Sequence, residues 1–143
     1  MADGRLLLKL KDAPFEEPIL SKFTSDGTLR LLAYLTLLHD PDPAPVIGIE
    51  EPENQLHPKV VPVLASSIRA MSARSQIFVT THSPEFLRDL QPKELWSIHR
   101  TEDGYAKVMR ASQDDRVRAM LASGASLAEL WSEGFLSGAD PVR

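Results

Sequence analysis

The sequence has 143 residues, of which 16 are Lys or Arg and 20 are Asp or Glu, giving a net charge of −4. Hydrophobic residues make up 43% of it, which excludes a disordered tail and predicts one globular domain over residues 1–143. The sequence contains no cysteine, which excludes disulfide scaffolds, cysteine nucleophiles and cysteine-ligated zinc.

Composition gives no support to a membrane or a large nucleic-acid surface. No apolar run approaches the roughly 20 residues that cross a bilayer, and the N-terminal sequence lacks the apolar core and cleavage site of a secretory signal. We therefore expect a cytoplasmic protein with no membrane partner. The net negative charge argues against a surface that grips nucleic acid through many phosphate contacts.

The first third of the chain is predicted to contain one strand and one long helix. Residues 4–11 have the composition of a strand, and the proline-containing residues 12–24 are predicted to be an irregular connection. Residues 25–27 precede an apolar segment, residues 29–40, whose spacing is helical; we expect this helix to be largely buried. Three prolines within residues 41–45 end it.

The middle of the chain has the pattern of a strand, a helix and a second strand. Residues 46–49 are apolar without alternation, which is typical of a strand covered on both faces in a parallel sheet. A helix is predicted over about 59–73 and a second strand at 77–79. This order predicts a right-handed crossover between two parallel strands.

The last third is predicted to be a hairpin followed by two short helices. Residues 95–100 and 105–110 form the hairpin, with Gly104 in its turn. The helices are predicted at about 114–121 and 127–131.

Charged side chains follow the two predicted parallel strands at the point where each strand ends. Glu50 and Glu51 come directly after the first strand, and His82 follows the second. Ligands bind beyond the carboxyl ends of parallel strands, so these residues are expected to share one edge of the sheet. Two carboxylates and an imidazole there are able to hold Mg²⁺, orient a water and sense a phosphate. Taken singly, each residue is as well explained by a solvated acidic turn or a helix cap.

A third element precedes the long apolar helix. Ser25, Asp26 and Gly27 stand where backbone donors and the positive end of the helix dipole face an anion, and Gly27 permits close approach of the backbone. Alone, Ser25 or Asp26 is simply a helix cap.

Together the three elements resemble one family. The segments TSDGTLRLLAYLTLL, VIGIEEPENQLHP and FVTTHSPEFL are similar, in that order, to the signature helix, the Walker B and D-loop segment, and the switch-histidine loop of an ABC-type ATPase. The closest resemblance is to the RecF-like or SMC-like "AAA family" ATPases of DNA repair and phage defence. The segment ELWSEGFLSGADP also looks like that family's closing segment, so the resemblance covers nearly the whole chain.

The resemblance implies a fold and a partner arrangement. The fold is α/β, part of a P-loop NTPase (ABC ATPase) fold, with parallel strands, crossover helices, a C-terminal hairpin and short helices. A P-loop pattern is absent, since no two of the seven glycines are five apart with Lys following. The chain thus looks like the C-terminal half of a nucleotide-binding domain. The implied partner is a half, or a full-length ATPase subunit, that carries Walker A, in a homo- or heterodimer; DNA is implied by family alone.

The resemblance also implies roles for single residues, with ATP and Mg²⁺ as cofactors. Glu50 matches the acidic residue that supports Mg²⁺, usually through water, although the family commonly has Asp there. Glu51 matches the catalytic carboxylate that polarises the attacking water. His82 matches the switch histidine that contacts the γ-phosphate.

The remaining implied site residues belong to the signature and the D-loop. Gln55 and His57 lie in the D-loop, which crosses to a second subunit. Ser25 and Gly27 match the signature that clamps the γ-phosphate of ATP on the opposite subunit. Asp26 adds a negative charge there, and we expect its carboxylate to turn away and cap the helix.

The main hypothesis is an ATPase that hydrolyses ATP only when a Walker A half completes it. Two alternative functions remain open. The first is a non-catalytic regulatory or interaction module that docks onto a complete ATPase. The second is a metal-dependent hydrolase built on Glu50, Glu53, His57 and His82. Smaller features are expected to be structural, among them Trp131 as a packing residue.

Overall fold

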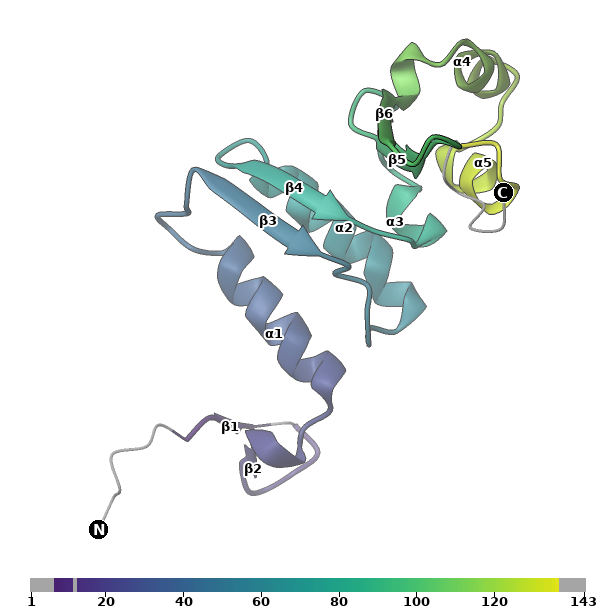
Figure 1. The fold of residues 1–143 in the computed structure, drawn as a ribbon. Helices are drawn as coiled ribbons and strands as arrows, with labels where there is room; N and C mark the ends of the chain where they lie inside the picture. The colour runs from purple at the N-terminus through teal and green to yellow at the C-terminus, as the bar shows by residue number, and fades with distance from the viewer. Residues whose placement is uncertain (1–6, 12, 137–143) are drawn as a thin grey trace.

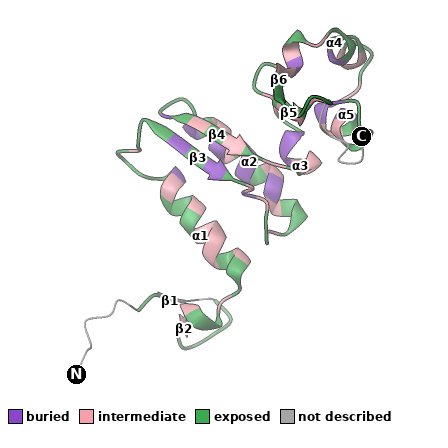
Figure 2. Cartoon of the chain, viewed as in Figure 1, coloured by how far each residue is buried: buried purple, intermediate pink, exposed green. Residues whose placement is uncertain are grey.

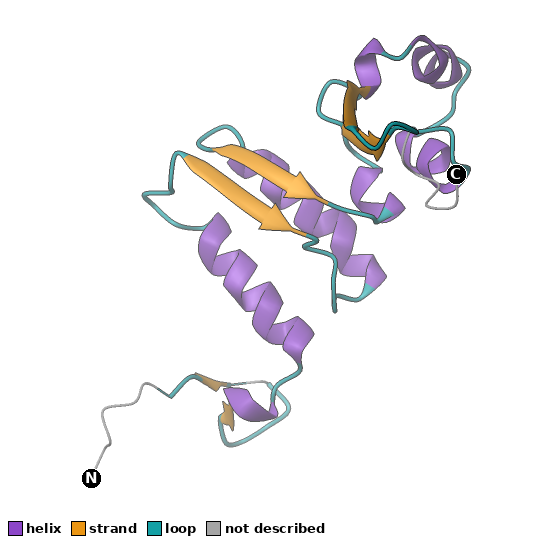
Figure 3. Cartoon of the chain, in the orientation of Figure 1, coloured by secondary structure: helices purple, strands orange, loops and turns teal. Residues whose placement is uncertain are grey.

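A computed structural model describes residues 7–11 and 13–136, which form a mixed α/β fold (Figure 1, Figure 3). Within these residues the strands pair into three two-stranded sheets. The strands are β1 (Lys9–Leu10), β2 (Ile19–Leu20), β3 (Val46–Glu50), β4 (Gln76–Thr80), β5 (Trp96–Arg100) and β6 (Ala106–Arg110). The α-helices are α1 (Asp26–Leu38), α2 (Val61–Met71), α3 (Pro84–Leu87), α4 (Asp115–Ala122) and α5 (Leu127–Ser132). Short 3-10 helices are η1 (Ser21–Phe23), η2 (Pro58–Val60) and η3 (Ala111–Gln113).

The N-terminal strand is shorter than predicted. Of the predicted residues 4–11, the first three lie outside the described residues, and only β1 is a strand. It pairs antiparallel with β2, which lies in the segment predicted to be irregular. The pair ends at Leu10 and Ile19 because the next residue opposite would be Pro18, which has no N–H to donate.

Helix α1 begins three residues before the predicted segment 29–40 and ends two residues before the end of that segment, and it is not largely buried. Its N-cap is Ser25, whose hydroxyl accepts the Thr28 N–H at 3.2 Å. Leu38 is its one buried residue, and Leu35 is exposed (Figure 2). The apolar spacing predicted burial on all sides, whereas the described residues cover the helix along only part of its surface. The expectation of a buried helix is therefore wrong.

Strands β3 and β4 are parallel and joined through α2, as predicted (Figure 1). Their register pairs Ile47 with Ile77 and Glu50 with Thr80. Ile47 and Ile49 are buried with α2, but the opposite face is open, since Val46 is 56% and Phe78 60% exposed. The expectation that the first strand is covered on both faces is wrong, because helix α2 covers only one face.

The buried residues form two hydrophobic clusters. The first joins α1, β3, α2 and α3, and its buried members are Leu38, Ile47, Ile49, Val61, Leu64, Ala65, Ile68, Met71 and Phe86. The second joins α3 to the C-terminal helices, and its buried members are Leu87, Ala111, Val117, Leu127, Leu130 and Leu136. Leu90 packs against both clusters. Arg69 also links α2 to the segment after α3, because its guanidinium donates to the Glu94 carboxylate at 3.2 Å and to the Asp89 carbonyl at 3.0 Å.

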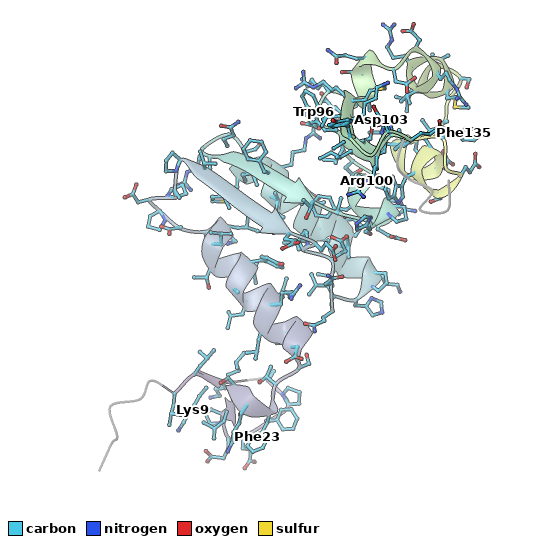
Figure 4. The ribbon with its side chains drawn as sticks, viewed as in Figure 1. Lys9, Phe23, Trp96, Arg100, Asp103 and Phe135 are labelled. Carbon is cyan, nitrogen blue, oxygen red and sulfur yellow. The ribbon has the colours of Figure 1, made fainter. Side chains whose placement is uncertain are left out.

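The hairpin and the last two helices agree with the predicted ranges. Strands β5 and β6 pair antiparallel, with Gly104 in the turn at φ 86°. Trp96 and Arg100 lie at the two ends of β5, and Asp103 lies in the turn (Figure 4). No helix among the described residues has both the length and the apolar character needed to cross a membrane.

The packing of α2 yields a direct test with two adjacent residues. Leu64 is 3% exposed and Val63 is 64% exposed. Leu64→Ala is expected to lower the free energy of unfolding by about 2–5 kcal/mol because it leaves a cavity in the first cluster. Val63→Ala is expected to change it by no more than about 0.5 kcal/mol. Urea denaturation of the two variants measures both values, and equal losses would show that α2 does not pack on this side.

Candidate functional site

The carboxyl ends of β3 and β4 bring the three predicted residues to one edge. Glu50, the last residue of β3, lies opposite Thr80 and is exposed on the open face of the sheet. The Glu51 N–H continues the pairing by donating to the Thr80 carbonyl at 2.9 Å. His82 follows two residues after β4 ends. The predicted shared edge of Glu50, Glu51 and His82 is therefore present.

Glu51 and His82 face each other across this edge. Glu51 Oε1 lies 3.8 Å from His82 Nε2, and the other carboxylate oxygen accepts the Asn54 amide N–H at 2.6 Å. The side chains are 37% and 79% exposed, respectively. A contact this exposed contributes little to stability. The arrangement leaves a carboxylate that is bonded to Asn54 next to an accessible imidazole.

The backbone of the loop after β3 is unusual at two residues. Glu51 has φ 40° and Gln55 has φ 66°, although neither is glycine. Left-handed backbone at such residues is uncommon and tends to occur at functional sites. Here it turns the loop so that its first residue, Glu51, lies at the strand edge while Gln55 faces α1.

Glu53 makes contacts with the loop after β4 that the sequence did not indicate. Its Oε1 accepts two hydrogen bonds, from the Thr81 hydroxyl at 2.6 Å and from the His82 N–H at 2.9 Å. Its Oε2 is buried and has no hydrogen-bond partner among the described residues. The sequence pointed to Glu53 only as a ligand of the alternative metal-dependent hydrolase. Its hydrogen bonds to a distant loop leave no recognisable spacing in the sequence.

That hydrolase is contradicted. Across residues 7–11 and 13–136, no group of three or more His, Asp or Glu side chains is placed to hold a metal ion. Glu53 is engaged with the loop after β4, and His57 Nδ1 accepts the Lys59 N–H at 3.2 Å as the cap of η2. Glu50 and Glu51 remain as the two carboxylates at the edge. In proteins Mg²⁺ is commonly held by one or two carboxylates together with phosphate oxygens.

The predicted signature and D-loop residues line one cavity. It has a volume of about 270 Å³ and is lined by Ser25, Gly27, Thr28, Leu31, Gln55, Leu56, His57 and Val60. At its wall the loop touches the helix, because a Cβ placed on Gly27 would overlap the Gln55 carbonyl oxygen. Glycine at this position is thus required by the contact between α1 and the loop.

Asp26 does not have the capping role that was expected. The cap is Ser25, which has extended backbone, whereas Asp26 is the first residue of the helix and is exposed. A cap must precede the first helical turn, so the expectation for Asp26 is wrong. Its charge in the first turn still interacts favourably with the helix dipole.

Trp131 contacts the loop after β4 and is not only a packing residue. Its indole N–H donates to the His82 carbonyl at 3.2 Å, and the two ring centroids are 6.1 Å apart. The residues are 49 positions apart, and no local pattern in the sequence predicts the contact.

Comparison with known proteins identifies the family. A family model described as "AAA domain, putative AbiEii toxin, Type IV TA system" matches residues 8–88, more than half of the chain, and the chain belongs to this family. No curated protein matches the sequence. The match contains every residue assigned above to the strand edge and the cavity, whereas Trp131 lies outside it. It indicates a P-loop NTPase-like fold and an ATPase-type nucleotide-binding function.

The contact at Gly27 yields a test with a matched glycine. Gly27→Ala is expected to destabilise the chain by about 1–3 kcal/mol, because a backbone carbonyl must move to admit the methyl group. Gly48→Ala has no heavy atom within 4 Å of the new Cβ and is expected to be neutral or stabilising by up to about 1 kcal/mol. Thermal unfolding of both variants measures the difference. Similar stability for the two would mean that the loop and α1 are not in contact.

Proposed function

We propose that the chain supplies the hydrolytic residues of an ATPase of the RecF-like or SMC-like kind, serving DNA repair or phage defence. The chain acts with a half or subunit that carries a P-loop. The observation that carries this proposal is the approach of Glu51 Oε1 to 3.8 Å from His82 Nε2, where two parallel strands end. Membership of an AAA domain family supports the nucleotide as the substrate.

Glu51 is proposed to polarise the attacking water. Asn54 holds one of its oxygens at 2.6 Å, which leaves the other free to accept a proton from a water between the carboxylate and the γ-phosphate. His82, whose side chain is accessible, is proposed to donate to the γ-phosphate oxygens.

Glu50 is the carboxylate proposed to support Mg²⁺. When bound with the nucleotide, Mg²⁺ supplies neutralisation of the charge that develops on the phosphates during transfer. Glu50 is exposed at the end of β3, so a water molecule has room to join it to the ion.

The cavity beside α1 is proposed to receive the nucleotide of a second subunit. Ser25 and Gly27 stand at the amino end of a 13-residue helix, whose free N–H groups attract phosphate. Gln55 and His57, from the loop after β3, line the same cavity. Dimerisation across this surface would place the signature of one subunit against the γ-phosphate held by the other.

Hydrolysis in this scheme requires a P-loop, which the 143-residue sequence lacks. The chain alone is expected to bind MgATP weakly because it has no backbone cradle for the β- and γ-phosphates. Isothermal titration calorimetry of the pure chain with MgATP tests this. Micromolar affinity in that experiment would refute the requirement for a second half.

The role of Glu51 is tested in the completed enzyme. Glu51→Gln is expected to lower kcat by about 10²–10⁴-fold, since the amide cannot accept the proton of the attacking water. The same variant should still dimerise with ATP, measured by size-exclusion chromatography with light scattering. Glu102→Gln, an exposed change in the hairpin turn, is the matched control and should retain wild-type turnover. Retained turnover in Glu51→Gln would mean that the catalytic carboxylate has been assigned wrongly.

A non-catalytic module that docks onto a complete ATPase is the second candidate. The open face of β3 and β4 favours it, since Val46 and Phe78 are apolar and exposed there. Mixing the chain with a P-loop ATPase separates the two functions. Stimulation that is lost in Glu51→Gln supports catalysis, and stimulation that survives in this variant supports docking.

A further inference from the structure

The loop that carries His82 has little regular structure of its own. Thr81, His82 and Ser83 lie between the end of β4 and the start of α3. The imidazole is mostly exposed, so neighbouring side chains do not fix it by packing. Its position therefore depends on how the main chain of the loop is held.

One side of the His82 residue is held by Glu53. The His82 N–H donates to Glu53 Oε1 at 2.9 Å, and the Thr81 hydroxyl donates to the same oxygen at 2.6 Å. The Thr81 hydroxyl oxygen in turn accepts the Ser83 N–H at 3.0 Å. Hydrogen bonds to a charged acceptor are stronger than neutral ones. One carboxylate oxygen therefore holds Thr81 and His82 directly, and it holds Ser83 through the Thr81 hydroxyl.

The other side is held by Trp131 of α5. The indole N–H donates to the His82 carbonyl at 3.2 Å. Trp131 is itself firmly placed, because Leu127 and Leu130 of the same helix are buried in the second cluster. Helix α5 also has a capping box between Ser126 and Glu129. The Ser126 N–H and hydroxyl bond to the Glu129 carboxylate and lower its pKa, which keeps it ionised and bonded.

We infer that Glu53 and Trp131 are positioning residues, which fix the His82 main chain from its two sides and so aim the imidazole toward Glu51. The catalytic meaning of this clamp rests on the proposed function, whereas the clamp itself is a property of the chain without nucleotide. It makes the position of the histidine depend on the C-terminal helix α5, which lies outside the residues matched by the family.

The Trp131 side of the clamp is tested by NMR relaxation of the ¹⁵N-labelled 143-residue chain without nucleotide. Trp131→Phe keeps an aromatic ring and removes the N–H donor. The order parameter of the His82 amide is expected to fall from about 0.85 toward 0.6 or below. Trp96→Phe is the matched control, since Trp96 is exposed on the hairpin and stacks on Arg110. An unchanged His82 amide in Trp131→Phe, with unchanged amide signals elsewhere, overturns the inference.

The Glu53 side is tested by a pair of variants in the same experiment. Glu53→Gln keeps an acceptor oxygen and is expected to preserve the order of the His82 amide, whereas Glu53→Ala loses it. Circular dichroism establishes that each variant is folded, and Glu53→Gln remains informative if Glu53→Ala does not fold. Equal mobility of His82 in wild type, Glu53→Gln and Glu53→Ala would overturn the role of Glu53, and so would loss of order in Glu53→Gln.

A second readout separates this inference from the proposed function. In the completed ATPase, Trp131→Phe is expected to lower kcat by up to about 100-fold with little change in KM, because the imidazole is misplaced in the transition state. A wild-type chain that shows no ATPase activity even when it is completed by the P-loop half would refute the proposed function and leave the NMR result standing. A mobile His82 in Trp131→Phe with unchanged kcat would refute the link from the clamp to catalysis.

Discussion

The parallel register of β3 and β4 is the constraint on which the site depends. Pairing Glu50 with Thr80 sets both strand ends level, and the Glu51 N–H then donates to the Thr80 carbonyl. Only with this alignment does the loop after β3 run beside the loop after β4, so that Glu53 of the first loop reaches the His82 N–H of the second. A slip of one residue would move every side chain of β3 to the other face and separate the acid from the imidazole.

Sequence alone predicted the elements whose signals are local. The prolines within residues 41–45 and the turn at Gly104 each act on their own neighbours, and the adjoining helix and strands end close to where these residues predicted. Burial was predicted less well. The apolar run at residues 46–49 has the composition of a strand covered on both faces, yet coverage depends on what packs against the strand. In the described residues α2 covers only one side.

The residues of the candidate site also differ in whether the sequence predicted their contacts. Glu51 and His82 were predicted to meet because parallel strands end at one edge, which is a property of topology. The contacts of Glu53 and Trp131 were not predicted, because each joins a side chain to the main chain of a distant loop. Such bonds require a particular loop conformation and leave no periodicity or spacing in the sequence. The capping role expected for Asp26 was wrong by one residue, because the boundary between cap and first turn depends on backbone angles.

The backbone of the loop after β3 is strained at two residues, and this strain needs an explanation. Left-handed conformations at Glu51 and Gln55 cost of the order of 1–3 kcal/mol each, and glycine would adopt them with less strain. Glycine at residue 51 would, however, remove the carboxylate that Asn54 holds and that faces His82. The contact with His82 is too exposed to offset the strain through stability alone. The role proposed for Glu51 as the catalytic carboxylate would account for this conformation, whereas the stability of the fold does not.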